Sequence, residues 1–254
     1  MRKIDLQDVS FLFLIKLDSV VRLENLLVSL GFIIRNFNTN IKVFHVGCYD
    51  NGFIKKLLPK KVEYKFIKDE DNVFYRTKYI NMMVMETKTP IFGVWDADVI
   101  IPRNQIILSV EDIRNGFDVS YPYDGHFYDT SKIIRDYYIV NRNIELLTGN
   151  VGKMRMIYGN DMKGGAFLSR RESYIKSGME NENFYGWGPE DFERYSRWIN
   201  LGYRISRISG NLYHLTHSRG ENSKYRSQQQ IFATNKEYMK TKCSARNEIL
   251  DNFK

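Results

Sequence analysis

The feature that most constrains the fold is a regular alternation of strand-like and helix-like segments over the first hundred residues. Short apolar runs separate segments in which apolar residues recur at helical spacing. This order predicts an α/β fold, with a mostly parallel central sheet covered by helices. The expected strands are residues 11–17, 41–46, 62–67 and 90–95, and the expected helices are residues 20–34 and 74–86.

The second half of the chain is less regular, and the alternation stops near Pro102. Two glycines lead into an expected strand, and a polar tail is expected to be helical in part. The expected helices are residues 104–115 and 189–200, with helical spacing also at 131–147, and the expected strands are residues 118–121 and 164–169.

The chain has 254 residues and a net charge of +8, which suits an anionic ligand or an acidic membrane surface. Apart from that charge nothing indicates a nucleic-acid binder, because no finger, RNP-like run or long basic block is present. Cys48 and Cys243 lie far apart and suggest a reducing compartment. The apolar stretch Val9–Leu17 is too short to span a bilayer. We therefore expect a cytoplasmic protein, with peripheral attachment to the inner face of a membrane as an option.

The tetrad Trp95-Asp96-Ala97-Asp98 closes an apolar run that is expected to be a buried strand. Because side chains alternate along a strand, Asp96 and Asp98 are expected to point the same way at the edge of the sheet where ligands gather. A divalent cation between them and a ligand would relieve the repulsion of two neighbouring carboxylates. A bare D-x-D is more often a pair of solvated turn residues, so this motif needs support from elsewhere in the chain.

A second group of residues centres on Trp187, which two glycines flank and which Glu190 and Asp191 follow at an expected helix start. As ordinary structure, the acidic pair would complement the helix dipole and the Trp would fill the core. Glycines on both sides leave the backbone mobile, however, which is unusual for a core anchor. An aromatic ring beside carboxylates is a common way to bind a sugar.

Two of the four histidines, His214 and His217, lie three residues apart. On a continuing strand such residues face opposite sides, so they share a metal only if the chain turns. We therefore expect His217 to be a metal ligand and His214 to be a weaker second one. Carboxylate and imidazole ligands with open water positions suit Mn²⁺, with Mg²⁺ as the substitute.

Together these motifs resemble those of GT-A glycosyltransferases, and the C-terminal half resembles the β-1,4-galactosyltransferase and chondroitin-polymerase branch. The resemblance implies the GT-A fold and spans roughly residues 8–226. It rests, in chain order, on Trp95-Asp96-Ala97-Asp98, Gly164-Gly165-Ala166, Tyr185-Gly186-Trp187-Gly188-Pro189-Glu190-Asp191 and His217-Ser218-Arg219.

The resemblance also implies an organisation of the chain. Residues 1–102 would be the nucleotide-sugar-binding half, and residues 103–226 would hold the donor sugar, the acceptor and the catalytic loop. Residues 227–254 would form a helical tail, all within one integrated GT-A domain.

At the metal, the resemblance makes Asp98 and His217 ligands, and His214 falls where that family can place another ligand. Asp96, with Ala97 beside it, would hold the ribose of the nucleotide or the water shell of the metal.

At the sugars, the resemblance makes Asp191 the general base and Glu190 a ligand of acceptor hydroxyls. Trp187 would line the sugar site, and Gly164 and Gly165 would let the backbone approach the donor sugar.

Four further residues resemble the family's nucleotide-side positions, although ordinary polarity near helix starts explains them equally well. They are Asp18, Arg22, Arg76 and Asn81. Two features depart from the family. Pro189 stands where relatives usually have a second glycine, which should stiffen the loop, and no Golgi-type anchor is visible.

The resemblance predicts a metal-dependent, inverting enzyme that moves a galactose-type hexose or N-acetylhexosamine from a UDP-sugar to a glycan or lipid-linked saccharide. A retaining enzyme of the polypeptide N-acetylgalactosaminyltransferase type is the nearest alternative, and the anomeric configuration of the product separates the two. A catalytically silent carbohydrate- or nucleotide-binding module is an alternative of another class. Residues 124–161 and the tail are the expected acceptor surface.

Overall fold

A mixed seven-stranded sheet lies at the centre of the computed structural model, which describes residues 2–50 and 52–252. Its strand order is β10-β6-β9-β4-β1-β2-β3, and only β9 runs antiparallel to its neighbours. The prediction of a mostly parallel α/β sheet is therefore confirmed. The strands are β1 (Ile4–Ile15), β2 (Phe37–Gly47), β3 (Glu63–Lys68), β4 (Ile91–Trp95), β6 (Val119–Tyr121), β9 (Ala166–Arg170) and β10 (Ile205–Arg207).

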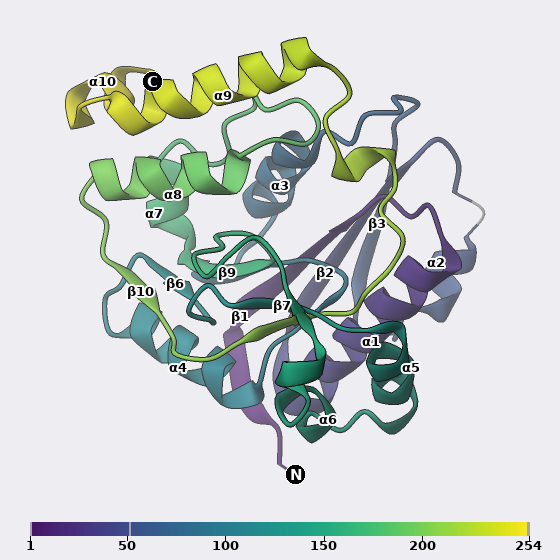
Figure 1. Cartoon of the computed structure of the whole chain (residues 1–254). Helices are drawn as coiled ribbons and strands as arrows, with labels where there is room; N and C mark the ends of the chain where they lie inside the picture. Colours follow the sequence, from purple (N-terminus) through teal and green to yellow (C-terminus); the bar gives the residue numbers. More distant parts are fainter. Residues whose placement is uncertain (1, 51, 253–254) are drawn as a thin grey trace.

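Helices cover both faces of this sheet, with α3, α7 and α8 above it and α1 and α4 below it in the view of Figure 1. The helices are α1 (Val20–Asn36), α2 (Phe53–Leu57), α3 (Arg76–Met85), α4 (Arg103–Arg114), α5 (Lys132–Asn141), α6 (Glu145–Thr148), α7 (Arg171–Lys176), α8 (Glu190–Asn200), α9 (Gln228–Cys243) and α10 (Arg246–Asn252).

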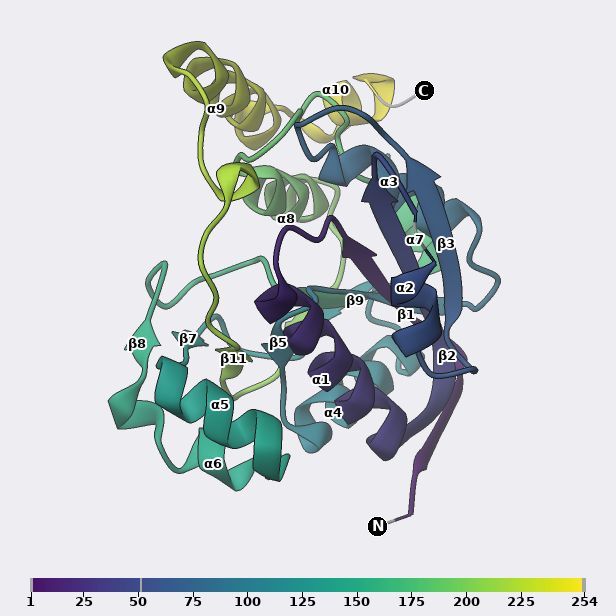
Figure 2. The ribbon, with the colours of Figure 1, turned by 90° about the vertical axis from the view of Figure 1, so that its right-hand side faces the viewer.

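A second, four-stranded sheet has the order β5-β11-β7-β8 and lies beside α5, as Figure 2 shows. Its four short strands come from distant parts of the chain, and sequence periodicity predicted none of them. They are β5 (Val99–Ile100), β7 (Phe127–Asp129), β8 (Arg155–Met156) and β11 (Leu212–His214).

Local sequence explains the central elements well. Every residue of β4 is buried, as expected for a strand that is covered on both faces. Helix α1 begins at an N-cap, where the Ser19 side chain accepts a hydrogen bond from the backbone N–H of Arg22. Its apolar face, which includes Leu26, Leu30 and Ile33, packs into the core against the strands.

Several boundaries differ from the sequence prediction. Strand β4 ends at Trp95, so Asp96 and Asp98 lie in the following turn and not on the strand. Strand alternation therefore does not explain where these two side chains point. The helical spacing at residues 131–147 corresponds to two helices, because Arg142 ends α5 in a left-handed conformation with φ of 55°.

The two halves expected on either side of Pro102 share the central sheet, since β4 pairs with β9. The tail is helical, as expected, and α9 packs along α8 (Figure 1). Within the described residues, no helix is both long and apolar enough to cross a membrane.

Candidate active site

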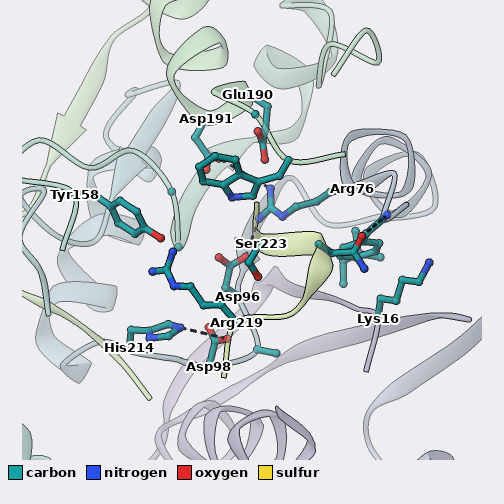
Figure 3. A pocket seen from close by; sticks show the side chains of 18 of the residues that line it. Lys16, Arg76, Asp96, Asp98, Tyr158, Glu190, Asp191, His214, Arg219 and Ser223 are labelled. Carbon is teal, nitrogen blue, oxygen red and sulfur yellow. Dashed lines mark hydrogen bonds and ion pairs between the residues drawn. The ribbon is translucent and has the colours of Figure 1, made fainter. Parts of the chain in front are cut away.

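A cavity of about 370 Å³ opens where β1 and β4 end, and it collects residues from both halves of the chain (Figure 3). Such an edge is where ligands bind in open α/β sheets. Most of the residues expected at the site line this cavity, namely Arg22, Arg76, Asp96, Ala97, Asp98, Gly164, Gly165, Trp187, Glu190, Asp191, His214 and His217.

Asp98, His214 and His217 form a compact group of possible metal ligands at one edge of the cavity. One ligand atom from each lies within 4.8 Å of the others. The Asp98 Oδ2 atom is 3.0 Å from His217 Nε2 and 3.5 Å from His214 Nε2. Both histidines therefore face the same carboxylate, and His217 lies closer to it.

The two histidines can face the same carboxylate because β11 ends at His214, so strand alternation does not extend to His217. On the other side, Asp98 directly precedes β5, whose Val99 pairs with His214. The Leu215 N–H also donates to the Asp98 carbonyl at 2.7 Å. The small sheet thus decides this geometry, which the spacing of His214 and His217 left open.

Charges at this edge favour an ionised Asp98. Burial opposes ionisation, but the positive charges and hydrogen bonds of His214 and His217 hold the pKa of Asp98 well below its usual range. Burial likewise opposes protonation of His214, whereas Asp98 and Asp129 together raise the pKa of His214 to about 9. A cation at this place would replace a proton on the imidazole.

Asp96, the first acidic residue of the tetrad, has a different partner. Its Oδ1 atom lies 2.7 Å from Arg76 Nη2. Burial raises the pKa of Asp96, the Arg76 charge opposes that rise, and Asp98 and Asp191 add to it. The two aspartates of the tetrad therefore experience opposite influences.

At the opposite edge, two guanidinium groups hold Asp191 at the start of α8. Its Oδ1 atom is 2.7 Å from Arg194 Nη2 and 4.0 Å from Arg76 Nη1. Burial would raise the pKa of Asp191, but Arg194 and Arg76 lower it overall. Arg194 is itself fixed by two 2.8 Å hydrogen bonds to Glu180, and both side chains are about 1% exposed.

Glu190, next to Asp191, is a buried carboxyl whose Oε2 atom has no hydrogen-bond partner among the described residues. Burial and the neighbouring charge of Asp191 raise the pKa of Glu190 to about 8. Because it lines the cavity, this carboxyl is able to bind a polar group of a ligand.

Two glycines pack the backbone closely against these groups. A Cβ atom at Gly164 would lie 2.5 Å from Asp191 Oδ2. Gly165 has φ of 85°, and a Cβ there would lie 2.8 Å from Leu212. Only glycine fits either position without displacing the surroundings.

Several solved glycosyltransferases have similar folds. The catalytic domain of Drosophila β1,4-galactosyltransferase 7, in complex with xylobiose, aligns with a TM-score of 0.59 at 14% identity, over 94% of this chain and 82% of that chain. Glucosyl-3-phosphoglycerate synthase from Mycobacterium tuberculosis, in complex with Mn²⁺, UDP and phosphoglyceric acid, aligns at 0.53 and 12% identity, over 93% and 78%.

This chain has the GT-A glycosyltransferase fold. GalNAc-T7, solved with UDP, GalNAc and Mn²⁺, has a TM-score of 0.60 at 12% identity, over 92% of this chain but 47% of that chain. Residues 150–219 match a family model described as the N-terminal domain of galactosyltransferase. A search among curated proteins gives no match.

Trp187 lines the cavity of this GT-A fold and does not fill the core. Its ring meets Tyr225 edge-on, with ring centroids 4.6 Å apart. Its carbonyl accepts a 3.0 Å hydrogen bond from Gln230 at the start of α9. The Trp187 loop is therefore held by the segment that follows His217.

Two residues expected on the nucleotide side do not line the cavity. Asn81 is about 5% exposed, and its amide group donates hydrogen bonds to Glu180 and Glu182, so it holds the segment before α8. Asp18 pairs with Arg22 at 3.2 Å. The other two residues expected on the nucleotide side, Arg22 and Arg76, do line the cavity.

Sequence reasoning missed several residues that the structure places in or beside this site. Lys16, Phe74, Tyr158 and Arg219 line the cavity, and Arg219 lies over the Tyr158 ring at 5.1 Å. Arg219 was within a recognised motif and could have been identified there. The other three are single residues on irregular segments or strand ends, so no periodicity or spacing marks them.

Proposed function

We propose that this protein is a metal-dependent, inverting glycosyltransferase that uses a UDP-sugar donor. The sugar transferred would be a hexose or N-acetylhexosamine of the galactose type, and the acceptor a hydroxyl group of a glycan or lipid-linked saccharide. The observation that carries the proposal is that Asp98 and His214 lie across one cavity from Asp191 (Figure 3), and that His217 groups with them.

The comparisons support this class of reaction. The galactosyltransferase model covers the segment that contains Glu190, Asp191, His214 and His217. Drosophila β1,4-galactosyltransferase 7 was also solved, as a mutant, with manganese, UDP-Gal and xylobiose. Its TM-score to this chain is 0.55 at 14% identity, so it supports the fold directly and the substrates by analogy.

The ligand set fits a divalent cation. One carboxylate and two imidazoles converge within 4.8 Å and leave the cavity side open, which suits Mn²⁺, with Mg²⁺ as the weaker substitute. When bound, the ion would supply positive charge for a departing diphosphate. Asp98, His214 and His217 would hold it, while Arg22, Arg76 and Lys16 add positive charge along the same cavity.

Asp191 would take the proton from the acceptor hydroxyl. Arg194 and Arg76 keep its carboxylate ionised, as a base requires, and the start of α8 adds a favourable dipole. Proton transfer by a placed carboxylate contributes ~10²–10⁴-fold to such reactions. Because this base and the metal ligands lie at opposite edges of the cavity, attack from the side opposite the leaving group is favoured, which inverts the anomeric centre.

Glu190 would bind a sugar hydroxyl beside the base. With its raised pKa, the carboxyl is protonated over much of the neutral range, so it can donate a hydrogen bond as well as accept one. Trp187 would offer its ring to the apolar face of a sugar.

The alternative within this fold is a retaining enzyme, and the fold similarity to GalNAc-T7 supports it. The anomeric configuration of the product, read by NMR, decides between the two. Peripheral attachment to an acidic membrane is a further part of the proposal, which rests on the net charge of +8. Co-sedimentation with anionic vesicles tests it.

The function is tested by thermal shift with a panel of nucleotide sugars, with and without Mn²⁺, followed by donor hydrolysis. We expect a UDP-sugar to raise the melting temperature only with Mn²⁺, and the same donor to be hydrolysed. Asp98→Asn should abolish both effects. Asp8→Asn, at a surface ion pair with Arg114, is the matched control and should retain them. Metal-independent stabilisation without turnover would favour a silent binding module.

A further inference from the structure

Asp129, which lies outside the cavity lining, contacts one of the candidate metal ligands from behind. Its Oδ1 atom is 2.8 Å from His214 Nδ1, while His214 Nε2 faces Asp98 at 3.5 Å. The Asp129 side chain is about 26% exposed and that of His214 about 14%. The His214 ring therefore lies between two carboxylates, one on each nitrogen.

The small sheet builds this arrangement across three neighbouring strands. In β7 and β11, Asp129 and His214 are direct register partners. In β11 and β5, His214 is the partner of Val99, which follows Asp98. Partners on adjacent strands project to the same face. Asp129 and His214 thus project to one face, and Asp98, in the turn before β5, faces His214 Nε2 at 3.5 Å.

Other contacts keep Asp129 and His214 in place. The Thr130 N–H donates to the His214 carbonyl at 3.0 Å, and Thr216 Oγ1 lies 3.4 Å from Asp129 Oδ2. The His214 ring also rests against Phe127, with ring centroids 5.6 Å apart. Little freedom remains for the imidazole to rotate.

His217 has a comparable contact on its own Nδ1 atom. The Ser218 carbonyl, which can only accept, lies 2.7 Å away, so Nδ1 of His217 carries the hydrogen and Nε2 faces Asp98. Both histidines therefore have an oxygen acceptor on Nδ1 and present Nε2 to the same place. An acceptor on the outer nitrogen of a metal-binding histidine fixes its tautomer and orientation.

We infer that Asp129 is a positioning residue of the metal centre, which accepts the Nδ1 hydrogen of His214 and so holds Nε2 toward the cation. This inference rests on the proposed function only in that both require a metal at Asp98, His214 and His217. Asp129 does not line the cavity, so its effect should appear in metal binding before any chemistry takes place.

The test is a Co²⁺ titration of the whole chain, followed by visible absorbance and without any nucleotide sugar. Asp129→Ala should raise the Kd for Co²⁺ by about 10–100-fold. Asp129→Asn keeps an oxygen acceptor but loses the charge, so a smaller rise is expected. Asp124→Ala is the control, because Asp124 makes the same kind of contact with His126 Nδ1, at 2.6 Å, away from the metal ligands.

Three results would overturn the inference. They are a wild-type protein that does not bind Co²⁺, an Asp129→Ala variant with the wild-type Kd, and an Asp124→Ala variant weakened as much as Asp129→Ala. If Asp129→Ala does not fold, ¹⁵N spectra of the Zn²⁺-loaded wild type decide, since a metal on Nδ1 of His214 contradicts the inference. Co²⁺ binding without donor hydrolysis would refute the glycosyltransferase while leaving the role of Asp129 intact.

Discussion

The two edges of the cavity hold their acidic groups with different cations. At the metal edge, the imidazoles of His214 and His217 hold Asp98, whereas at the α8 edge the guanidiniums of Arg194 and Arg76 hold Asp191. An imidazole can give up its proton to make way for a metal ion, but a guanidinium stays charged. The positive charge beside Asp98 can therefore be exchanged for that of a metal ion, whereas the positive charge beside Asp191 is permanent.

Each edge also pairs an acidic group of lowered pKa with a neighbour of raised pKa. Cationic partners lower the pKa values of Asp98 and Asp191, while burial raises the pKa values of Asp96 and Glu190. Neighbouring carboxyl groups with opposite shifts are typical of sites where the two take different roles. The comparison can be tested one edge at a time.

The largest effect is expected from Asp191→Asn at the α8 edge. An amide cannot accept the proton of the acceptor hydroxyl, so turnover should fall by ~10²–10⁴-fold. Binding of UDP to the Mn²⁺-loaded protein, measured by calorimetry, should stay nearly unchanged. A large loss of UDP affinity would place Asp191 among the nucleotide ligands and not at the acceptor.

The second largest effect is expected from Arg194→Met, which should mainly lower the stability of the fold. It leaves Glu180 as an unpaired buried charge, so the free energy of unfolding should fall by about 3–5 kcal/mol in urea titrations. The control is Lys176→Met, which breaks the exposed pair with Glu172 and should change little. Equal effects of the two variants would show that the α8 edge is no more rigid than the surface.

Gly164→Ala should displace the base without removing it. The new Cβ would lie 2.5 Å from Asp191 Oδ2, and a shift of the carboxylate can cost up to ~10²-fold in rate. Gly31→Ala in α1, where no atom lies within 4 Å of the new Cβ, is the control and should keep full activity. A fully active Gly164→Ala variant would contradict the tight placement of Asp191.

The smallest effect concerns the pH dependence of stability through Glu190. Its pKa is about 8 in the folded protein against an ordinary 4.5, so the folded state binds the proton more tightly. Its contribution to the free energy of unfolding is complete below about pH 4.5 and is lost as the pH rises through about 8. Glu190→Gln should therefore gain stability relative to wild type between these pH values, as measured by urea unfolding. A difference that is constant with pH would contradict the raised pKa.

The sequence predicted the elements whose pattern is local. Periodicity located β4 and α1, and Gly-flanked Trp187 with the following acidic pair marked the start of α8. These features follow from burial on both faces of a strand, from an amphipathic helix and from helix-start preferences, all of which act over a few neighbouring residues. The identity of most cavity residues was also within reach, because they occur in short motifs.

The tertiary structure alone decided how those residues meet. Spacing could not tell whether His214 joins His217, because this depends on where β11 ends and on its pairing with β5 and β7. Asp129 carries no motif, and only cross-strand register places it behind His214. Asn81 has the expected polarity yet points to Glu180 and Glu182. Contacts between residues distant in the chain set these outcomes, since each depends on hydrogen bonds that local sequence does not encode.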